Sequence, residues 1–197
     1  MIVRLTDYQM KLCKLFSEES AKTQQRIEFG QRGTERTINE IAKDNLIGKM
    51  GEAAVAKMLN EEFHLHVPTN FEIYQRGDYD DNDLEINGWS IDVKTTRRGK
   101  YLLLEKHKVD FRIKLFTFPD VILMCRVPND DSNEVEIIGC ISASRLINPN
   151  TPEVRRLKMG DYIPNTLCQL QADNYCVRFQ DLCEPRKAIN YMIRSKK

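Results

Sequence analysis

The chain has 197 residues, of which 41% are hydrophobic and 30% are charged, so it suits one globular domain with extensions and is too balanced for wholesale disorder. The formal net charge of +1 argues against binding of polyanions through bulk charge, although it leaves local patches open. Apolar runs are too short for a bilayer span, and the N-terminus shows no secretory signal. We therefore expect an intracellular, cytoplasmic protein without membrane contact.

The N-terminal part of the chain is predicted to be mainly helical. Apolar residues recur at helical spacing between Leu5 and Phe16. A second helix is expected to begin with Asp44 or Asn45 as its N-cap and to continue through LIGKMGEAAVAKMLNEEF. From about Phe71 the apolar period approaches two, which indicates strands with short helices between them. This order of elements favours an α/β or α+β domain.

The segment DLEINGWSIDVKTT, residues 83–96, predicts a β-hairpin. Asn87 and Gly88 tolerate the positive φ angles that a two-residue hairpin turn requires. This turn pairs Ile86 with Trp89, Glu85 with Ser90, Leu84 with Ile91, and Asp83 with Asp92. Alternation along the strands then separates an apolar side (Leu84, Ile86, Trp89, Ile91, Val93) from a polar side (Asp83, Glu85, Ser90, Asp92, Lys94).

The expected register brings Asp83 and Asp92 directly opposite each other. Two carboxylates about 5 Å apart repel by roughly 3 kcal/mol at an effective dielectric constant of about 20. A shared proton, Lys94, or a divalent cation would relieve this repulsion, and we favour Mg²⁺ or Mn²⁺ because both prefer oxygen ligands. The alternative is a solvated row of charges on an exposed strand face. If the repulsion is real, Asp92→Asn should be at least as heat-stable as the wild type without metal.

The six cysteines show no C-x-x-C spacing. Cys125 and Cys140 lie in apolar strand-like runs and are expected to be buried, reduced thiols. A metal cluster built from Cys168, Cys176 and Cys183 is the alternative.

The order of these acidic and basic residues resembles that of the PD-(D/E)XK nuclease superfamily. The likeness rests on Asp83, on Asp92-Val93-Lys94, and on a preceding helix GKMGEAAVAKML that carries Glu52. It implies a restriction-endonuclease-like fold, an α/β (α+β) core with a mixed β-sheet flanked by helices. On this reading, residues 44–147 form the nuclease core, residues 1–43 an N-terminal helical extension, and residues 148–197 a C-terminal extension packed on the core.

The resemblance also implies an activity and a site. The chain would be a Mg²⁺-dependent nuclease that hydrolyses phosphodiester bonds, most simply a DNA endonuclease, with Mn²⁺ able to substitute. The implied catalytic residues are Glu52, Asp83, Asp92 and Lys94. The implied metal ligands are Asp83, Asp92, the Val93 carbonyl and Glu52. Three aspartates just upstream remain alternatives to Asp83 as first ligand: Asp78, Asp80 and Asp81.

Two glycines next to Glu52 weaken the predicted helix. Gly48 and Gly51 each cost a helix about 1 kcal/mol relative to alanine. Their presence is explained if the helix passes close to the sheet or to a phosphate backbone, which would bring Glu52 to the metal. An exposed helical glutamate is the alternative.

The charge pattern changes sign near Asp92. An acidic stretch between residues 72 and 92 is followed by a basic stretch between residues 94 and 114, an order that suits metal binding beside phosphate contacts. The expected partner is nucleic acid, DNA in preference to RNA, and a homodimer is left open. The predicted nucleic-acid-binding residues are Arg97, Arg98, Lys100, Lys106 and Lys108. A catalytically inactive nucleic-acid-binding module or an adaptor on the same fold is the alternative function.

Overall fold

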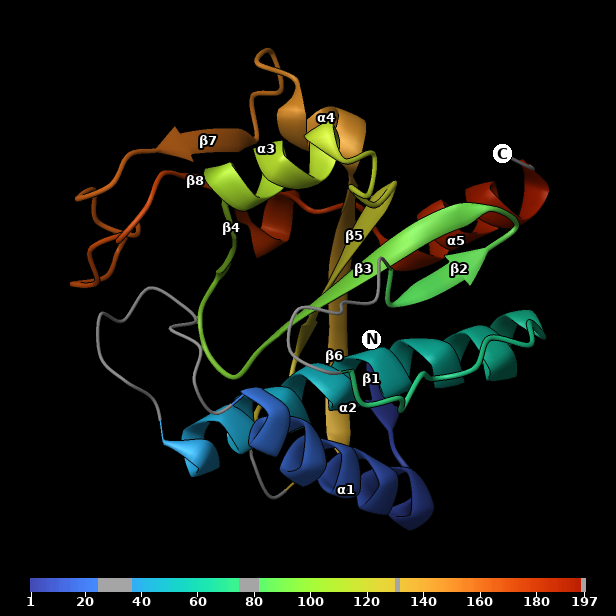
Figure 1. Ribbon diagram of the computed structural model, residues 1–197. Helices are drawn as coiled ribbons and strands as arrows, with labels where there is room; N and C mark the ends of the chain where they lie inside the picture. Colours follow the sequence, from blue (N-terminus) through green and yellow to red (C-terminus); the bar gives the residue numbers. More distant parts are fainter. Residues whose placement is uncertain (25–36, 75–81, 130–131, 196–197) are drawn as a thin grey trace.

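The computed structural model describes residues 1–24, 37–74, 82–129 and 132–195, which form two β-sheets and the helices around them (Figure 1). The main sheet has the strand order β1-β6-β5-β3-β2, and the smaller sheet has the order β4-β8-β7. Strands β3 and β5 are parallel, whereas the other neighbours are antiparallel. The main-sheet strands are β1 (Ile2–Arg4), β2 (Leu84–Ile86), β3 (Trp89–Thr96), β5 (Val121–Arg126) and β6 (Glu134–Ser142). Those of the smaller sheet are β4 (Tyr101–Glu105), β7 (Val154–Leu157) and β8 (Asn174–Arg178).

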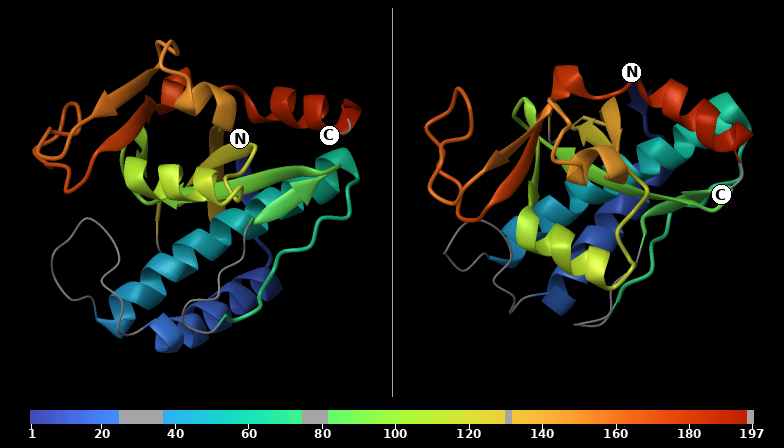
Figure 2. Two further views of the ribbon diagram at one scale, coloured as in Figure 1. Left: turned by 45° about the horizontal axis from the view of Figure 1, so that its top comes forward. Right: turned by 90° about the horizontal axis from the view of Figure 1, so that it is seen from above.

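The helices lie on both faces of the main sheet, as predicted for a mixed α+β fold. Helices α1 (Asp7–Gln24) and α2 (Ile38–Phe63) pack together below the sheet in Figure 1. On the opposite face lie α3 (Lys106–Lys114), α4 (Ala143–Ile147) and the smaller sheet (Figure 2). The C-terminal part adds a short 3₁₀ helix, η1 (Phe179–Asp181), and α5 (Pro185–Arg194).

Strand β5 divides the core into two parts. Val121, Leu123 and Cys125 belong to the apolar cluster that includes α2. Ile122 and Met124 belong to a second cluster, with side chains from α3, α4 and the smaller sheet. Burial on both faces explains why this central strand has an almost continuous apolar sequence.

The predicted hairpin is confirmed. Asn87 and Gly88 have φ angles of 49° and 84°. Three of the predicted pairs form: Leu84 with Ile91, Glu85 with Ser90, and Ile86 with Trp89. The predicted apolar side is buried at Leu84, Ile86, Ile91 and Val93 and partly buried at Trp89.

One prediction about the N-terminal part, the start of its second helix, is wrong. Helix α2 begins at Ile38 because Thr37 and Glu40 form a capping box, so the start predicted at Asp44 or Asn45 falls inside the helix. The boundary expected between residues 43 and 44 therefore cuts through α2. The short strand β1 pairs with β6, so residues 1–43 also contribute a strand to the main sheet.

The C-terminal residues are integrated into the fold. Strand β8 pairs with β4, across a wide separation in sequence. Helix α5 packs at the hairpin, where the Trp89 indole N–H donates a hydrogen bond to the Ser195 carbonyl oxygen at 2.7 Å. The rings of Trp89 and Tyr191 also meet edge to face, with centroids 5.8 Å apart.

Within the described residues, no helix combines the length and apolar character needed to cross a bilayer. All six cysteines lie in the described ranges and carry free thiols, and Cys125 and Cys140 are buried as predicted.

Candidate active site

Helix α2 approaches strand β3 very closely at Gly51. A Cβ atom at this position would lie 1.9 Å from Thr95 Oγ1, so any other residue would force the Thr95 side chain or the helix to shift. This confirms that the helix passes close to the sheet, which places Glu52 beside β3. Gly48 has open space around its Cα, so the close approach does not account for that glycine.

Glu52 is held in a buried environment by Lys49. The Glu52 side chain is only 14% exposed and forms an ion pair with the Lys49 ammonium group. Lys49 also donates a hydrogen bond to the Asn70 carbonyl oxygen at 2.8 Å, and its Nζ lies 4.2 Å from the ring centroid of Phe16. Burial, followed by the negative charge of Asp83, raises the pKa of Glu52 to about 7, although Lys49 opposes this rise. Sequence reasoning missed Lys49, but its i, i+3 spacing from Glu52 was a visible signal.

Asp83 bonds to β3 with its side chain. Its Oδ2 accepts a hydrogen bond of 2.6 Å from the Val93 backbone N–H, while its own backbone N–H donates to the Ile91 carbonyl oxygen at 3.2 Å. The predicted direct pair of Asp83 with Asp92 is therefore not formed, because the regular ladder ends at Leu84. Burial and then the charge of Asp92 raise the pKa of Asp83 above its ordinary value, against the effects of Lys94 and the Val93 N–H.

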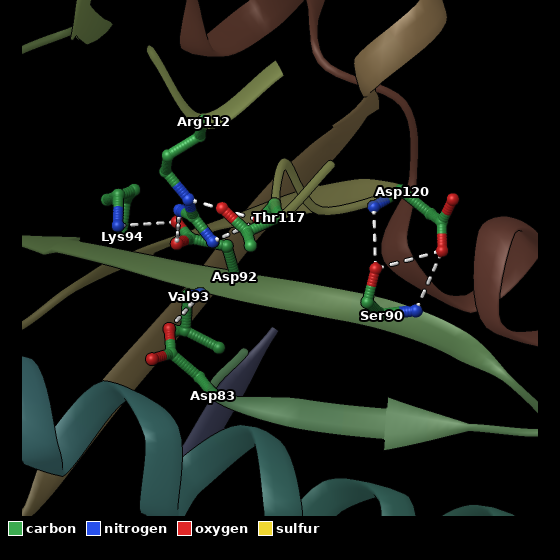
Figure 3. Close-up of polar contacts among 8 residues, drawn as sticks. All are labelled: Asp83, Ser90, Asp92, Val93, Lys94, Arg112, Thr117 and Asp120. Carbon is green, nitrogen blue, oxygen red and sulfur yellow. Dashed lines mark hydrogen bonds and ion pairs between the residues drawn. The ribbon is translucent and has the colours of Figure 1, made fainter. Parts of the chain in front are cut away.

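Asp92 projects from β3 toward α3 and carries two cationic partners (Figure 3). Lys94 Nζ lies 2.5 Å from Oδ2, and Arg112 Nη1 lies 2.9 Å from Oδ1. Burial disfavours its charge, but these two cations outweigh burial and hold the pKa of Asp92 below its ordinary value. Asp92 is only 5% exposed, which excludes the alternative of a solvated row of charges at this position.

Arg112 is a site residue that sequence reasoning missed. It lies on α3, and its guanidinium group is held in place by two hydrogen bonds to the Thr117 carbonyl oxygen, from Nε at 3.2 Å and from Nη2 at 2.9 Å. The sequence places it only within a basic stretch, because the packing of α3 over β3 is a tertiary feature with no local signal.

Lys94 links the candidate carboxylates electrostatically. Burial disfavours its positive charge, but Asp92 and Asp83 outweigh this effect and raise the pKa of Lys94. Its side chain as a whole is 42% exposed, while its ammonium group pairs with the buried Asp92 carboxylate. Lys94 is thus a protonated cation at neutral pH and is suited to stabilise negative charge on a bound anion.

The candidate donors suit Mg²⁺ in their chemistry. Glu52, Asp83, Asp92 and the Val93 carbonyl offer only oxygen atoms, and a divalent cation would offset the cost of ionising Glu52 and Asp83. In the described part of the chain, however, no three aspartate, glutamate, histidine or cysteine side chains stand close enough to hold a metal as they are. Binding would require Asp92 to exchange a cationic partner for the ion. The alternative ligands Asp78, Asp80 and Asp81 lie outside the described residues.

A basic groove adjoins these residues. It has a volume of about 930 Å³, and Lys94 is part of its lining. Its other basic lining residues are Arg97, Arg98, Lys100 and Arg126, and no acidic residue of the described chain lines it. Three of the five residues predicted to bind nucleic acid therefore share one surface: Arg97, Arg98 and Lys100.

The other two predicted nucleic-acid-binding residues lie on α3, outside this groove. Lys106 forms an ion pair with Asp110 at 2.5 Å, and Lys108 forms one with Glu105 at 3.0 Å. Lys108 lines a smaller pocket of about 310 Å³, together with Asp92 and Arg112. The basic stretch of the sequence thus divides between two surfaces.

Comparisons with protein-family models, with curated proteins and with solved structures find no match to this chain. The likeness to a nuclease family therefore depends on the site residues themselves.

Proposed function

We propose that this chain is a metal-dependent nuclease with a restriction-endonuclease-like fold, which hydrolyses phosphodiester bonds in DNA. One observation carries the proposal. Helix α2 meets β3 at Gly51, next to Glu52, while Asp83 bonds to the Val93 N–H of β3, and Asp92 and Lys94 of the same strand form an ion pair, so the four residues form one group. That group adjoins a groove whose charged lining residues are all basic. Acids next to a cationic surface are what binding of a metal and a phosphate backbone requires.

The proposed role of each site residue follows from its charge. Asp83, Glu52, Asp92 and the Val93 carbonyl would hold Mg²⁺, which supplies Lewis acidity at the phosphate when bound. The pKa values of Glu52 and Asp83 are raised, and a bound cation would lower them again because it stabilises the ionised carboxylates. Lys94 would offset the negative charge that develops on the phosphate, because its raised pKa keeps it protonated.

One observation favours the alternative, an inactive nucleic-acid-binding module. Asp92 already has Lys94 and Arg112 as partners, so its charge is balanced without a metal. In an inactive module this arrangement would persist in the presence of divalent cations. Binding of nucleic acid would then be the same with Mg²⁺ and with a chelator.

Cleavage assays with site variants test the proposal. Plasmid, linear duplex, single-stranded DNA and RNA are incubated with Mg²⁺ or Mn²⁺ and with wild type, Asp83→Asn or Glu52→Gln. We expect wild type to cleave DNA and both variants to lose at least about 100-fold in rate, a typical size for loss of a group that acts on the transition state.

Glu85→Gln is the matched control, because Glu85 is an exposed carboxyl group on the same hairpin. It should cleave like the wild type. Circular dichroism verifies that each variant is folded. Absence of metal-dependent cleavage by the wild type, or unchanged cleavage by Asp83→Asn, would refute the proposed activity.

A further inference from the structure

Two cations in the basic groove lack a carboxylate partner among the described residues. Arg98 and Lys100 are exposed, and neither forms an ion pair with a described side chain. By contrast, the groove residues Arg97 and Arg126 are paired with Asp44 and Glu136. Arg98 and Lys100 flank Gly99, which has a φ angle of 115°. This pair of cations is therefore available for an anion from outside the chain.

The rest of the groove is largely apolar. Tyr101 is the first residue of β4 and lines the groove. The Tyr101 hydroxyl oxygen accepts a hydrogen bond of 3.2 Å from Asn165 Nδ2. The apolar lining residues are Leu103, Pro128, Ile163 and Pro164, together with Leu102 and Met124, which are buried in the core beneath the groove. A duplex presents phosphates and sugars on its outside and keeps the faces of its bases stacked within. Unpaired bases, in contrast, offer apolar faces to such a surface.

We propose that the groove binds an unpaired segment of a polynucleotide. Arg98 and Lys100 contact phosphates, while Tyr101 and its apolar neighbours contact the bases. Because Lys94 also lines the groove, a strand held there passes next to the candidate active site. The inference rests on the proposed function and narrows its substrate to nucleic acid that is single-stranded at the site.

Binding assays in EDTA test this proposal separately from cleavage. Fluorescence anisotropy is measured with labelled oligothymidylate, oligouridylate and a mixed-sequence duplex, each about 20 nucleotides long so that it exceeds one groove of this kind. We expect a single strand to bind at least about tenfold more tightly than the duplex, because stacked bases leave the apolar surface unused. The two single strands show whether the groove distinguishes DNA from RNA.

Charge variants test whether binding depends on the cations of the groove or only on the total charge of the protein. The double variant Arg98→Gln/Lys100→Gln should lower single-strand affinity and reduce the slope of log K against log salt by about 1.4, or about 0.7 for each phosphate that is no longer neutralised. The matched control is Lys11→Gln/Lys14→Gln, which removes two exposed cations from α1. Its salt slope should stay at the wild-type value.

Tyr101 variants test the base contacts. Tyr101→Ala should weaken binding of a single strand by about tenfold without changing the salt slope, since a stacking contact carries no charge. Tyr101→Phe keeps the ring and loses only the hydrogen bond with Asn165, so its affinity should stay close to wild type.

Three results would overturn the inference: duplex affinity equal to that of a single strand, equal losses in the groove and α1 double variants, or wild-type binding by Tyr101→Ala. If the wild type binds a single strand as expected but never cleaves with Mg²⁺ or Mn²⁺, only the proposed nuclease activity fails. If it cleaves and the groove variants bind normally, only the groove assignment fails.

Discussion

Asp92 is part of strand β3 and Asp83 bonds to that strand, but the neighbours of the two carboxyl groups differ. Asp92 lies on the α3 side between Lys94 and Arg112, and its pKa is lowered by these cations against the cost of burial. Asp83 accepts its hydrogen bond from the Val93 backbone N–H, forms no ion pair within the described residues, and has a raised pKa. Glu52 resembles Asp83 in this respect, since burial raises its pKa to about 7 even beside Lys49.

The ion pair of Asp92 stabilises the fold, whereas the buried carboxyl groups of Glu52 and Asp83 destabilise it when they are ionised. The charge on Asp92 is balanced by the chain itself. The charges on Glu52 and Asp83 are costly unless a cation arrives from outside, which is how functional sites commonly differ from structural ion pairs. Removing the charge of Asp92 should therefore destabilise the fold, whereas removing the charge of Glu52 or Asp83 should stabilise it.

The largest effect is expected from Asp92→Ala. This change leaves Arg112 and Lys94 without their carboxylate, and breaking a largely buried ion pair costs about 3 kcal/mol. The sequence predicts that Asp92→Asn is at least as heat-stable as the wild type without metal, whereas the two ion pairs predict a clear loss of stability. Urea denaturation in EDTA measures the free energy of unfolding. Asp92→Leu combined with Arg112→Met should recover most of the loss, and full stability of Asp92→Ala alone would contradict the ion pair.

The second effect concerns the pH dependence of Glu52. Its pKa is raised from an ordinary value of 4.5 to about 7, so the folded state holds this proton more tightly than the unfolded state. The resulting stability is fully present below pH 4.5 and is lost as pH rises through 7. Glu52→Gln lacks this dependence, so between pH 5 and 8 it should gain about 2–3 kcal/mol relative to the wild type. If the free energies of unfolding of the two proteins change in parallel with pH, the pKa of Glu52 is not raised.

Gly51→Ala tests the contact that places Glu52. The new methyl group would collide with Thr95, and overpacking of this kind costs about 2 kcal/mol. Gly48→Ala, one helical turn earlier, meets open space and should instead stabilise the helix by up to about 1 kcal/mol. Thermal denaturation distinguishes them, and equal effects would mean that α2 does not press against β3 at Gly51.

The smallest effect is stabilisation by Mg²⁺. A ligand at about ten times its Kd adds about 1.4 kcal/mol, which corresponds to about 4 °C in Tm for a chain of this size. The shift should be larger at pH 8 than at pH 6, because Glu52 and Asp83 must lose protons to bind a cation. Calorimetry with and without EDTA measures it. A shift that persists in Asp83→Asn would place the ion elsewhere.

Local chemistry explains which parts of the fold could be predicted. The hairpin was predictable because Asn87 and Gly88 satisfy a turn that few residue pairs allow, and this fixed the register of Leu84 with Ile91. The glycine at position 51 also predicted the close approach of α2 to the sheet. The start of α2 was predicted wrongly, although the capping pair Thr37 and Glu40 is present in the sequence.

Tertiary packing accounts for what could not be predicted. The side chain of Asp83 turns to the Val93 N–H where the ladder ends, so alternation along the strand no longer specifies its direction. Arg112 reaches Asp92 from α3, and β8 pairs with β4 across a long intervening segment. Such contacts depend on how distant segments meet, which no spacing within either segment reveals.

The fluorescence of Trp89 can report whether α5 is packed against the hairpin. It is the one tryptophan of the chain, and it lies on β3 with its indole N–H bonded to the Ser195 carbonyl oxygen and its ring against Tyr191. Release of α5 would expose this indole to water and shift its fluorescence emission to the red, while circular dichroism would register the helices as a whole. Detachment of the C-terminal helix can thus be told apart from global unfolding without any added label.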